Sequence, residues 1–466
     1  MRRFSHSLLP GRRLPTILEN SINRFCDNNM DTFIFATNQI ISSIAFGVLL
    51  WLGLFTGLFY SLFRKAINKE KIDFFDTNLV FRFIFFVYYG IPSLYYFFIP
   101  PAVDDFRQVT LNMVLVLAIL GLIFFDLGRK IAIHQQWQRF FESSEIDEQK
   151  VAKLTVIFFV IALLSFIIFI FSVGGLNSYI QNWGKTGDLT KGKMYLLWGV
   201  LLSKLAFLVN FAFHLKGKKT LAPFLLYALG GISFLLIMLI GARLLIIVYI
   251  LECLILYHYL KKEIPVKKLL IAALVIFIVF IVLMGEVRNH TWFQDMSLLE
   301  QIKTRLGDFS NYIYLLVNNY FDSVRNTIII LENTPSRFSY EWGRTYLDLL
   351  VRPIPYMFRP DIVKNSEILL ATFQGRILPL LGELYLNFSL AGIVIGTFFL
   401  GLFAKASSFF LRFNKANISA VLLYATLVAV TMMWVRGQFA NHTPLFLMDF
   451  IGFFVFIKLS QKSAKG

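Results

Sequence analysis

Long, nearly uninterrupted runs of apolar residues recur along the chain, separated by shorter polar connections. A run of about eighteen or more apolar residues is long enough to cross a bilayer as an α-helix, so each run predicts one membrane span. About eleven spans are expected, at 33–63, 79–98, 109–127, 154–173, 195–214, 221–240, 244–260, 269–284, 380–403, 418–435 and 443–459. The pattern predicts an all-α polytopic integral membrane protein with ten to twelve spans.

The polar connections alternate in their content of lysine. The lysine-rich set comprises 64–78, 128–153, 215–220, 261–268, 404–417 and the tail after residue 459. Positively charged connections stay on the cytoplasmic side, so the remaining connections are expected to face outward. The predicted parts are an N-terminal tail over 1–30, spans 1–8 over 31–284, an external segment over 285–379, and spans 9–11 with a cytoplasmic tail over 380–466. Eleven spans place the arginine-containing tail outside, which conflicts with the same rule.

Composition supports the membrane class and excludes others. Hydrophobic residues make up 57% of the chain and aromatic residues 17%. The formal net charge of +17 is the kind of excess that nucleic-acid-binding proteins carry, but here the lysines gather at span ends, where topology explains them. The two cysteines, Cys26 and Cys253, lie far apart in the sequence, so neither a disulfide framework nor a cysteine metal site is expected.

The external segment 285–379 prefers arginine, whereas the cytoplasmic connections prefer lysine. It holds eight arginines against two lysines, together with ten acidic residues. The planar guanidinium suits bidentate binding of phosphate, although ten acids imply that many of these arginines are paired structurally. Ser297 and Glu300 have the spacing of a capping box, which predicts an amphipathic helix towards Asn319. We expect the segment to cover a cavity at the membrane surface.

Three arginines lie at the edges of spans on the predicted outer side, namely Arg243, Arg288 and Arg436. Each is either snorkelling to the interface or contributing to a shared site for an anionic ligand. A lipid diphosphate places several negative charges at this depth and is the favoured ligand. The external acids contain no Asp-x-Asp pair, and the histidines lack ligand spacing, so neither a metal nor another cofactor is expected.

A general base is sought among the acids and histidines near these arginines. Glu383 at the start of the ninth span is the first candidate, because a carboxylate half out of water can have a raised pKa. His442 and Asp322 are the competitors, and a salt bridge to an arginine is the structural alternative for Glu383. Tyr385 and Asn387 are expected to orient helices or sugar hydroxyls.

Few ionisable residues interrupt the spans, and no pair of broken helices or acid–base relay is evident. The main ones are Arg82, Lys204, Glu252, Glu383 and Asp449. This scarcity argues against a small-ion transporter or a flippase.

An ordered set of motifs carries a resemblance to a known family. It consists of Gly343-Arg-Thr-Tyr346, Pro353-Ile-Pro355, Arg359-Pro360, Gly382-Glu-Leu-Tyr-Leu-Asn-Phe388, then Gly392, Gly396 and Gly401, with Gly241-Ala-Arg243 and Arg436-Gly437. Residues 230–450 resemble the C-terminal half of the Wzy-type O-antigen and capsular oligosaccharide repeat-unit polymerases, while the first half is similar in span pattern only. Ser389 stands where a glycine commonly follows the Asn-Phe pair, which is expected to loosen one helix contact.

The resemblance implies a membrane glycosyltransferase of the GT-C type. Such an enzyme transfers a growing glycan from undecaprenyl diphosphate to a second lipid-linked repeat unit at the outer face of the bacterial cytoplasmic membrane, with inversion and without a metal. Arg243, Arg288 and Arg436 are the expected diphosphate clamp, with auxiliary contacts from Arg325, Arg344 and Arg376. A chain-length-regulating membrane protein is an expected partner. The alternatives are an O-antigen ligase acting on lipid A core and a non-enzymatic flippase of lipid-linked oligosaccharides.

Overall fold

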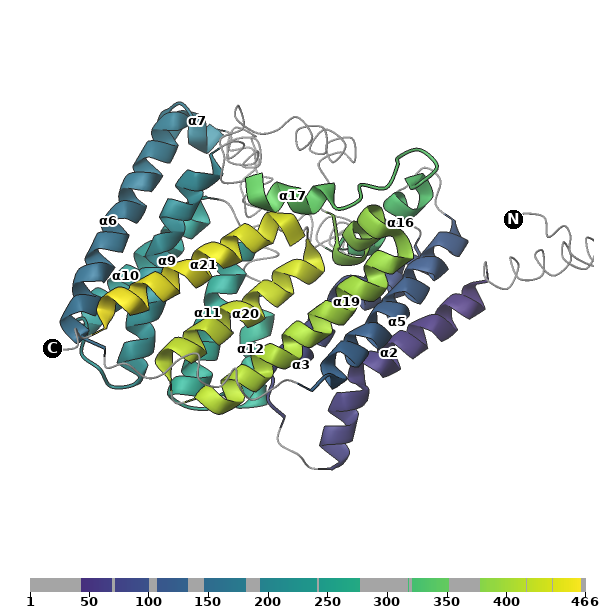
Figure 1. The fold of residues 1–466 in the computed structure, drawn as a ribbon, viewed down its shortest axis with the longest axis horizontal. Coiled ribbons are helices and arrows are strands. Elements are labelled where there is room, and N and C mark those ends of the chain that lie inside the picture. The colour runs from purple at the N-terminus through teal and green to yellow at the C-terminus, as the bar shows by residue number, and fades with distance from the viewer. Residues whose placement is uncertain are drawn as a thin grey trace, which may run out of the picture.

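The computed structural model of the chain is a bundle of helices (Figure 1). The structure describes residues 43–68, 72–99, 107–132, 146–181, 193–240, 243–276, 317, 321–351, 378–415, 417–437 and 439–461. Within these ranges there is no strand, and the one isolated bridge joins Ile146 to Gln461. The all-helical expectation is therefore met wherever the chain is described.

The helices follow the apolar runs closely. In chain order they are α2 (Ile44–Ile67), α3 (Thr77–Phe85), the π-helix η1 (Phe86–Gly90), α4 (Ile91–Tyr96), α5 (Gln108–Lys130), α6 (Glu148–Ser172), α7 (Gly175–Gln181), α9 (Met194–Leu215), α10 (Pro223–Leu239), α11 (Arg243–Leu260), α12 (Val266–Ile276), α16 (Ser323–Asn333), α17 (Arg344–Val351), α19 (Leu380–Asn414), α20 (Ile418–Arg436) and α21 (Phe439–Ser460).

Six stretches of helix in the described part are long and apolar enough to cross a membrane. They are Thr77–Tyr96, Gln108–Lys130, Glu148–Ser172, Tyr195–Leu215, Leu380–Asn414 and Ile418–Arg436, and shorter apolar helices cover Ile44–Tyr60, Pro223–Leu239 and Leu244–Leu260. A multi-pass membrane protein follows from these lengths. The count of eleven remains a prediction.

Burial separates the central helices of the bundle from the peripheral ones. In the most apolar 18-residue stretch of each helix, 83% of α20 is buried inside the protein, whereas 17% of α6 is buried. Figure 1 accordingly shows α6 at the margin of the bundle and α20 among other helices. α20 therefore packs almost entirely against protein, and α6 leaves most of its apolar surface exposed.

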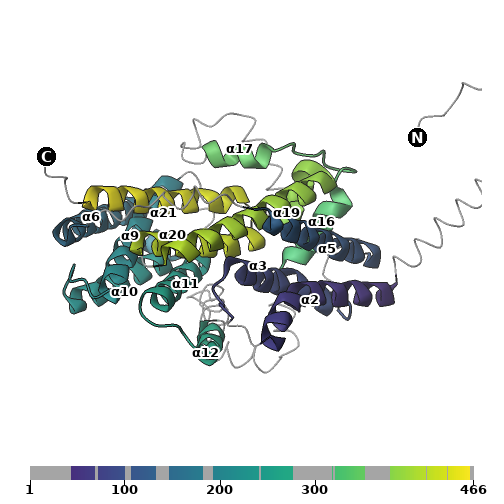
Figure 2. The same ribbon diagram turned by 60° about the horizontal axis from the view of Figure 1, so that its bottom comes forward.

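Residues in or next to the lysine-rich connections contact one another at one end of the bundle. The Tyr259 hydroxyl donates to Asp73 Oδ2 at 2.7 Å, Lys150 Nζ donates to the Gln461 carbonyl oxygen at 2.8 Å, and Lys218 Nζ lies 3.4 Å from Glu148 Oε1. Figure 2 shows α12, which follows one of these connections, on the opposite side of the bundle from α17 of the segment 285–379. The described lysine-rich connections thus lie at a different end of the bundle from α17 of the segment 285–379.

Glycines let α5 and α19 approach to backbone contact. A Cβ atom on Gly128 would lie 2.0 Å from the carbonyl oxygen of Phe398, and one on Gly401 would lie 2.0 Å from that of Phe125. No other residue fits at either position without separating the helices, which is how small residues act between membrane helices. This contact explains one glycine of the motif set.

α19 is broken near its start, which the sequence did not predict. Phe388 (φ −139°) and Ser389 (φ 55°, ψ −146°) leave the helical conformation, so residues 380–387 form a short half-helix before the long part, 390–414. The half-helix folds back along the long part, because a Cβ on Gly392 would lie 2.1 Å from the Leu384 carbonyl oxygen. Ser389 holds a positive φ that glycine adopts without strain, so the serine in place of the expected glycine bears on the backbone conformation at the break, and the looser helix contact stays a prediction.

Candidate active site

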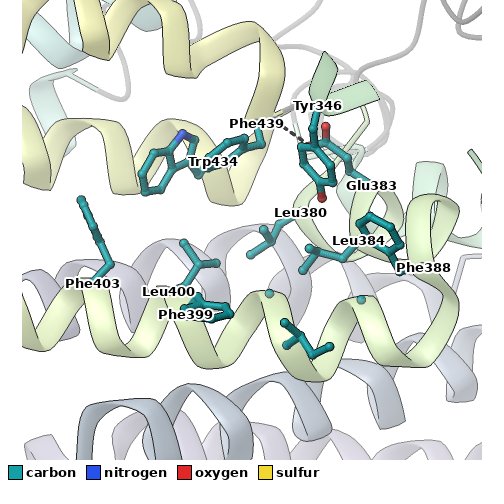
Figure 3. A pocket seen from close by; sticks show the side chains of 13 residues that line it. Tyr346, Leu380, Glu383, Leu384, Phe388, Phe399, Leu400, Phe403, Trp434 and Phe439 are labelled. Carbon is teal, nitrogen blue, oxygen red and sulfur yellow. Dashed lines mark hydrogen bonds between the residues drawn. The ribbon is translucent and has the colours of Figure 1, made fainter. Parts of the chain in front are cut away.

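A cavity of about 530 Å³ lies between the two parts of α19 and the adjoining ends of α17, α20 and α21. Its walls are almost entirely apolar and rich in aromatic side chains (Figure 3). The lining residues are Tyr346, Leu380, Glu383, Leu384, Phe388, Gly392, Ile395, Gly396, Phe399, Leu400, Phe403, Trp434 and Phe439. Glu383 is the one residue among them with an ionisable carboxyl group, which makes it the chemical focus of the cavity.

Glu383 is fixed by both of its carboxylate oxygens. The backbone N–H of Phe439 donates to Oε2 at 2.6 Å, and the Thr345 hydroxyl donates to Oε1 at 3.3 Å. Glu383 lies in the first turn of α19, and Phe439 is the first residue of α21, so two helix N-termini stabilise its negative charge. Glu383 was expected to lie half out of water, but its exposed fraction is 0%, because α17, α20 and α21 cover the half-helix.

Tyr346 lines the same cavity as Glu383. Its ring stacks on Phe388 with 6.1 Å between centroids and meets Phe439 edge-on at 5.8 Å, and Figure 3 shows its hydroxyl directed into the cavity. Burial, followed by the charge of Glu383, raises the pKa of Tyr346, so the phenol stays protonated and acts as a hydrogen-bond donor. In the sequence, Tyr346 ends the motif Gly343-Arg-Thr-Tyr346, which by itself indicates no role for its hydroxyl.

Asn387 ties the half-helix to α17. Its Nδ2 donates to Thr345 Oγ1 at 2.7 Å and to the Glu383 carbonyl oxygen at 2.8 Å, while its Oδ1 accepts from the Gly343 N–H at 3.0 Å. The residue is fully buried, so it orients helices, which is one of the two roles expected of it. Tyr385 lies on another face of the half-helix, against Tyr340, and does not line the cavity.

Arg436 and Asp322 form a second charged locus close to the cavity. Arg436 ends α20, two residues after the cavity-lining Trp434, and its Nε is buried without a hydrogen-bond partner in the described part of the chain. Burial raises the pKa of Asp322, and the positive charge of Arg436 opposes that shift, as does that of Arg325. Three of the predicted site residues, Asp322, Arg325 and Arg436, are therefore close enough for their charges to interact.

Of the remaining predicted site residues, the structure describes only some, and most of their side chains lie outside the described part. Arg344 is exposed at the start of α17 and does not line the cavity. Arg243 begins α11 and His442 lies in α21, but their side chains are outside the described part, as are Arg288, Arg376 and most of the helix predicted between Ser297 and Asn319.

Three ionisable side chains meet inside the bundle, away from the cavity. Lys204 of α9 lies 2.6 Å from Asp449 Oδ2 of α21 and 3.1 Å from Glu252 Oε2 of α11. All three are almost completely buried. The sequence had identified these residues singly, and the structure shows them as one ion cluster that joins three helices.

The bundle and its cavity define a multi-pass membrane protein with a buried carboxylate in the wall of an apolar cavity. A family model described as "Putative O-antigen polymerase" matches residues 75–351, more than half of the chain, which therefore belongs to this family. No curated protein and no solved structure matches the chain. The match includes the first half, where only the span pattern had seemed similar, and it ends before Glu383 and Arg436. The family indicates a polymerase role and a glycosyltransferase-like enzyme.

Proposed function

We propose that the chain polymerises oligosaccharide repeat units at the outer face of the bacterial cytoplasmic membrane. It transfers a growing glycan from undecaprenyl diphosphate to a hydroxyl group of a second lipid-linked repeat unit, as a membrane glycosyltransferase of the GT-C type. Membership of the polymerase family supports the reaction class. The geometry around Glu383 supports the location of the active site and the separate roles proposed for its residues.

The observation that carries the proposal is that a fixed carboxylate stands at the wall of an apolar cavity that adjoins lipid. Ile395 and Phe399 line the cavity and are 54% and 59% exposed, and exposed apolar side chains of a membrane helix face lipid. A substrate carried on a polyprenyl chain reaches Glu383 from the bilayer by this route. Apolar walls with a few convergent polar groups are the usual form of a site for such a ligand.

Glu383 and Arg436 have different roles in the proposed reaction. Glu383 accepts the proton of the acceptor hydroxyl as its oxygen attacks the anomeric carbon from the face opposite the diphosphate. The new C–O bond forms while the bond to the diphosphate oxygen breaks, and the bonding electrons leave with the diphosphate. Arg436 compensates the developing charge with its buried Nε, which has no hydrogen-bond partner in the described part.

The other predicted residues complete this arrangement. Arg243 and Arg288 are proposed to share the diphosphate with Arg436, and Arg325, Arg344 and Arg376 to contact carrier phosphates or sugar. Glu383 is preferred as the base over Asp322 because Glu383 lines the cavity and Asp322 does not. Tyr346 donates a hydrogen bond to a substrate oxygen in the same cavity.

The test uses the full-length protein in lipid nanodiscs, supplied with the lipid-diphosphate repeat unit of the producing cell. We expect a ladder of products, and we expect Glu383→Gln to lower its rate of formation at least a hundredfold, because general base catalysis typically contributes about 10²–10⁴-fold. Glu148→Gln, at the opposite end of the bundle, is the matched control and should leave the rate unchanged. A single addition in place of a ladder contradicts polymerisation, and a normal ladder from Glu383→Gln contradicts the role of Glu383.

A further inference from the structure

Three aromatic side chains meet on the side of the half-helix that does not line the cavity. The ring of Tyr340 lies 6.0 Å from that of Trp342 and 6.0 Å from that of Tyr385, edge-on in both cases. None of the three lines the cavity, and Trp342 is 74% exposed. We call Tyr340, Trp342 and Tyr385 the aromatic platform.

The backbone beneath the platform is held in an unusual conformation by several hydrogen bonds. Trp342 has a φ of 46° and Gly343 a φ of 87°. The Glu341 N–H donates to the Leu386 carbonyl oxygen at 2.9 Å, and the Trp342 N–H donates to the Asn387 carbonyl oxygen at 3.1 Å. A positive φ is costly for a bulky residue and persists only where the surroundings impose it. Here the surroundings impose it on a tryptophan whose indole remains exposed.

The platform is anchored directly to the cavity that holds Glu383. Asn387, whose carbonyl oxygen accepts from the Trp342 N–H, lies four residues, about 6 Å of helical rise, from Glu383. The Tyr340 hydroxyl donates to Ser389 Oγ at 3.2 Å, at the break in α19. The segment between α16 and α17 that carries Tyr340 and Trp342 passes over this end of α19 (Figure 1). A substrate group bound on the platform is therefore a neighbour of one bound at Glu383.

We propose that the aromatic platform is a binding subsite for a sugar ring of the substrate glycan, adjacent to the unit that reacts at Glu383. The C–H faces of a pyranose are apolar and pack on indole and phenol rings, while its hydroxyl groups stay hydrated at the rim. A rigid, exposed indole meets this requirement without ordering further side chains on binding. The inference depends on the proposed function for the identity of the glycan, and on the platform geometry alone for sugar binding.

Binding is measured without catalysis. Full-length protein in nanodiscs is titrated with the lipid-free repeat-unit oligosaccharide released by mild acid from the cell's own lipid-linked repeat unit, and intrinsic tryptophan fluorescence is followed. The sugar should change the fluorescence of the wild type, and the change should be lost in Trp342→Ala. Isothermal calorimetry on the same samples should show at least tenfold weaker binding by Trp342→Ala and near wild-type binding by Trp342→Phe. Equal binding of the oligosaccharide by wild type and Trp342→Ala would contradict the proposal that the aromatic platform binds sugar.

Kinetics separate the platform from the reaction itself. Trp342→Ala should raise the KM for the lipid-linked repeat unit about tenfold and change kcat less than twofold. Tyr60→Ala, which removes another exposed aromatic side chain from α2, should change neither. Unchanged KM together with weaker retention of the variant in membranes would identify Trp342 as an interfacial anchor and overturn the inference. Absence of any polymerisation by the wild type would overturn the proposed function, while the binding titration still tests the platform.

Discussion

At the scale of single residues, the chemistry of this protein depends on groups held in place from more than one direction. The carboxylate of Glu383 is held by the backbone of α21 and by the Thr345 hydroxyl. Arg436 contrasts with it, since its Nε is buried and lacks a hydrogen-bond partner in the described residues. A buried guanidinium nitrogen of this kind is poised for an incoming oxygen.

Replacing Arg436 by lysine tests whether the fork of the guanidinium is required. Lysine keeps the positive charge but loses Nε and bidentate geometry. We expect Arg436→Lys to lower the polymerisation rate by about tenfold to a hundredfold, the loss that corresponds to one or two charged hydrogen bonds. The rate is measured from the product ladder, and Arg337→Lys, at an exposed position between α16 and α17, should behave as wild type. Wild-type polymer length and rate from Arg436→Lys would contradict a role for this fork.

Some residues of the candidate site stand out in the sequence and others do not, and the reason is local. Glu383 and Arg436 stand out because a charge at the edge of an apolar run needs a partner. Tyr346 and Thr345 stand out in no such way, since their position beside Glu383 depends on α17 crossing the half-helix. Ser389 gave no sign of the break in α19, because serine is not a residue that favours positive φ.

At the scale of elements, the helices are joined by close backbone contacts and by one buried ion cluster. Gly128 and Gly401 hold α5 against α19, and Lys204, Glu252 and Asp449 join α9, α11 and α21. The cluster has two carboxyl groups for one ammonium, all removed from water. α21 also supplies the N–H group that holds Glu383, so the cluster fixes a helix on which the cavity depends.

Breaking this cluster should destabilise the protein strongly. Lys204→Met leaves two buried carboxyl groups without a cation, and removing one partner of a buried ion pair costs about 3–5 kcal/mol. We expect a clear fall in the Tm of the detergent-solubilised protein. The Tm is measured by heating samples and determining the remaining monodisperse protein by size-exclusion chromatography. Lys216→Met, at an exposed position beyond α9, should leave the Tm unchanged. Simultaneous replacement of Lys204, Glu252 and Asp449 by apolar residues should recover most of the lost Tm. A normal Tm for Lys204→Met alone would show that the ion pairs do not contribute to stability.

At the scale of the whole molecule, the two ends of the bundle differ. One end gathers the lysine-rich connections, and the other carries α16, α17, the break in α19 and the start of α21 (Figure 1). The cavity lies at the second end, beneath α17. Polymerisation outside the cytoplasm requires that this end face outward.

Cysteine labelling measures this orientation. In a variant with Cys26 and Cys253 replaced by serine, Arg337→Cys should react with a membrane-impermeant maleimide in intact spheroplasts, and Lys218→Cys should react only after permeabilisation. Both positions are exposed in the structure, so access to the reagent depends on the side of the membrane. The reverse pattern would place the cavity on the cytoplasmic side and contradict the proposed reaction.

The sequence alone determined the class of the protein, the approximate limits of its helices and the alternation of its connections, because apolar run length and lysine placement respond to the bilayer itself. It also selected Glu383 and Arg436 as residues that need partners. Only the tertiary structure decided which partners they have, where α19 breaks, which helices face lipid, and that Lys204, Glu252 and Asp449 meet. These features depend on contacts between segments distant in the chain, for which hydrophobic periodicity carries no signal.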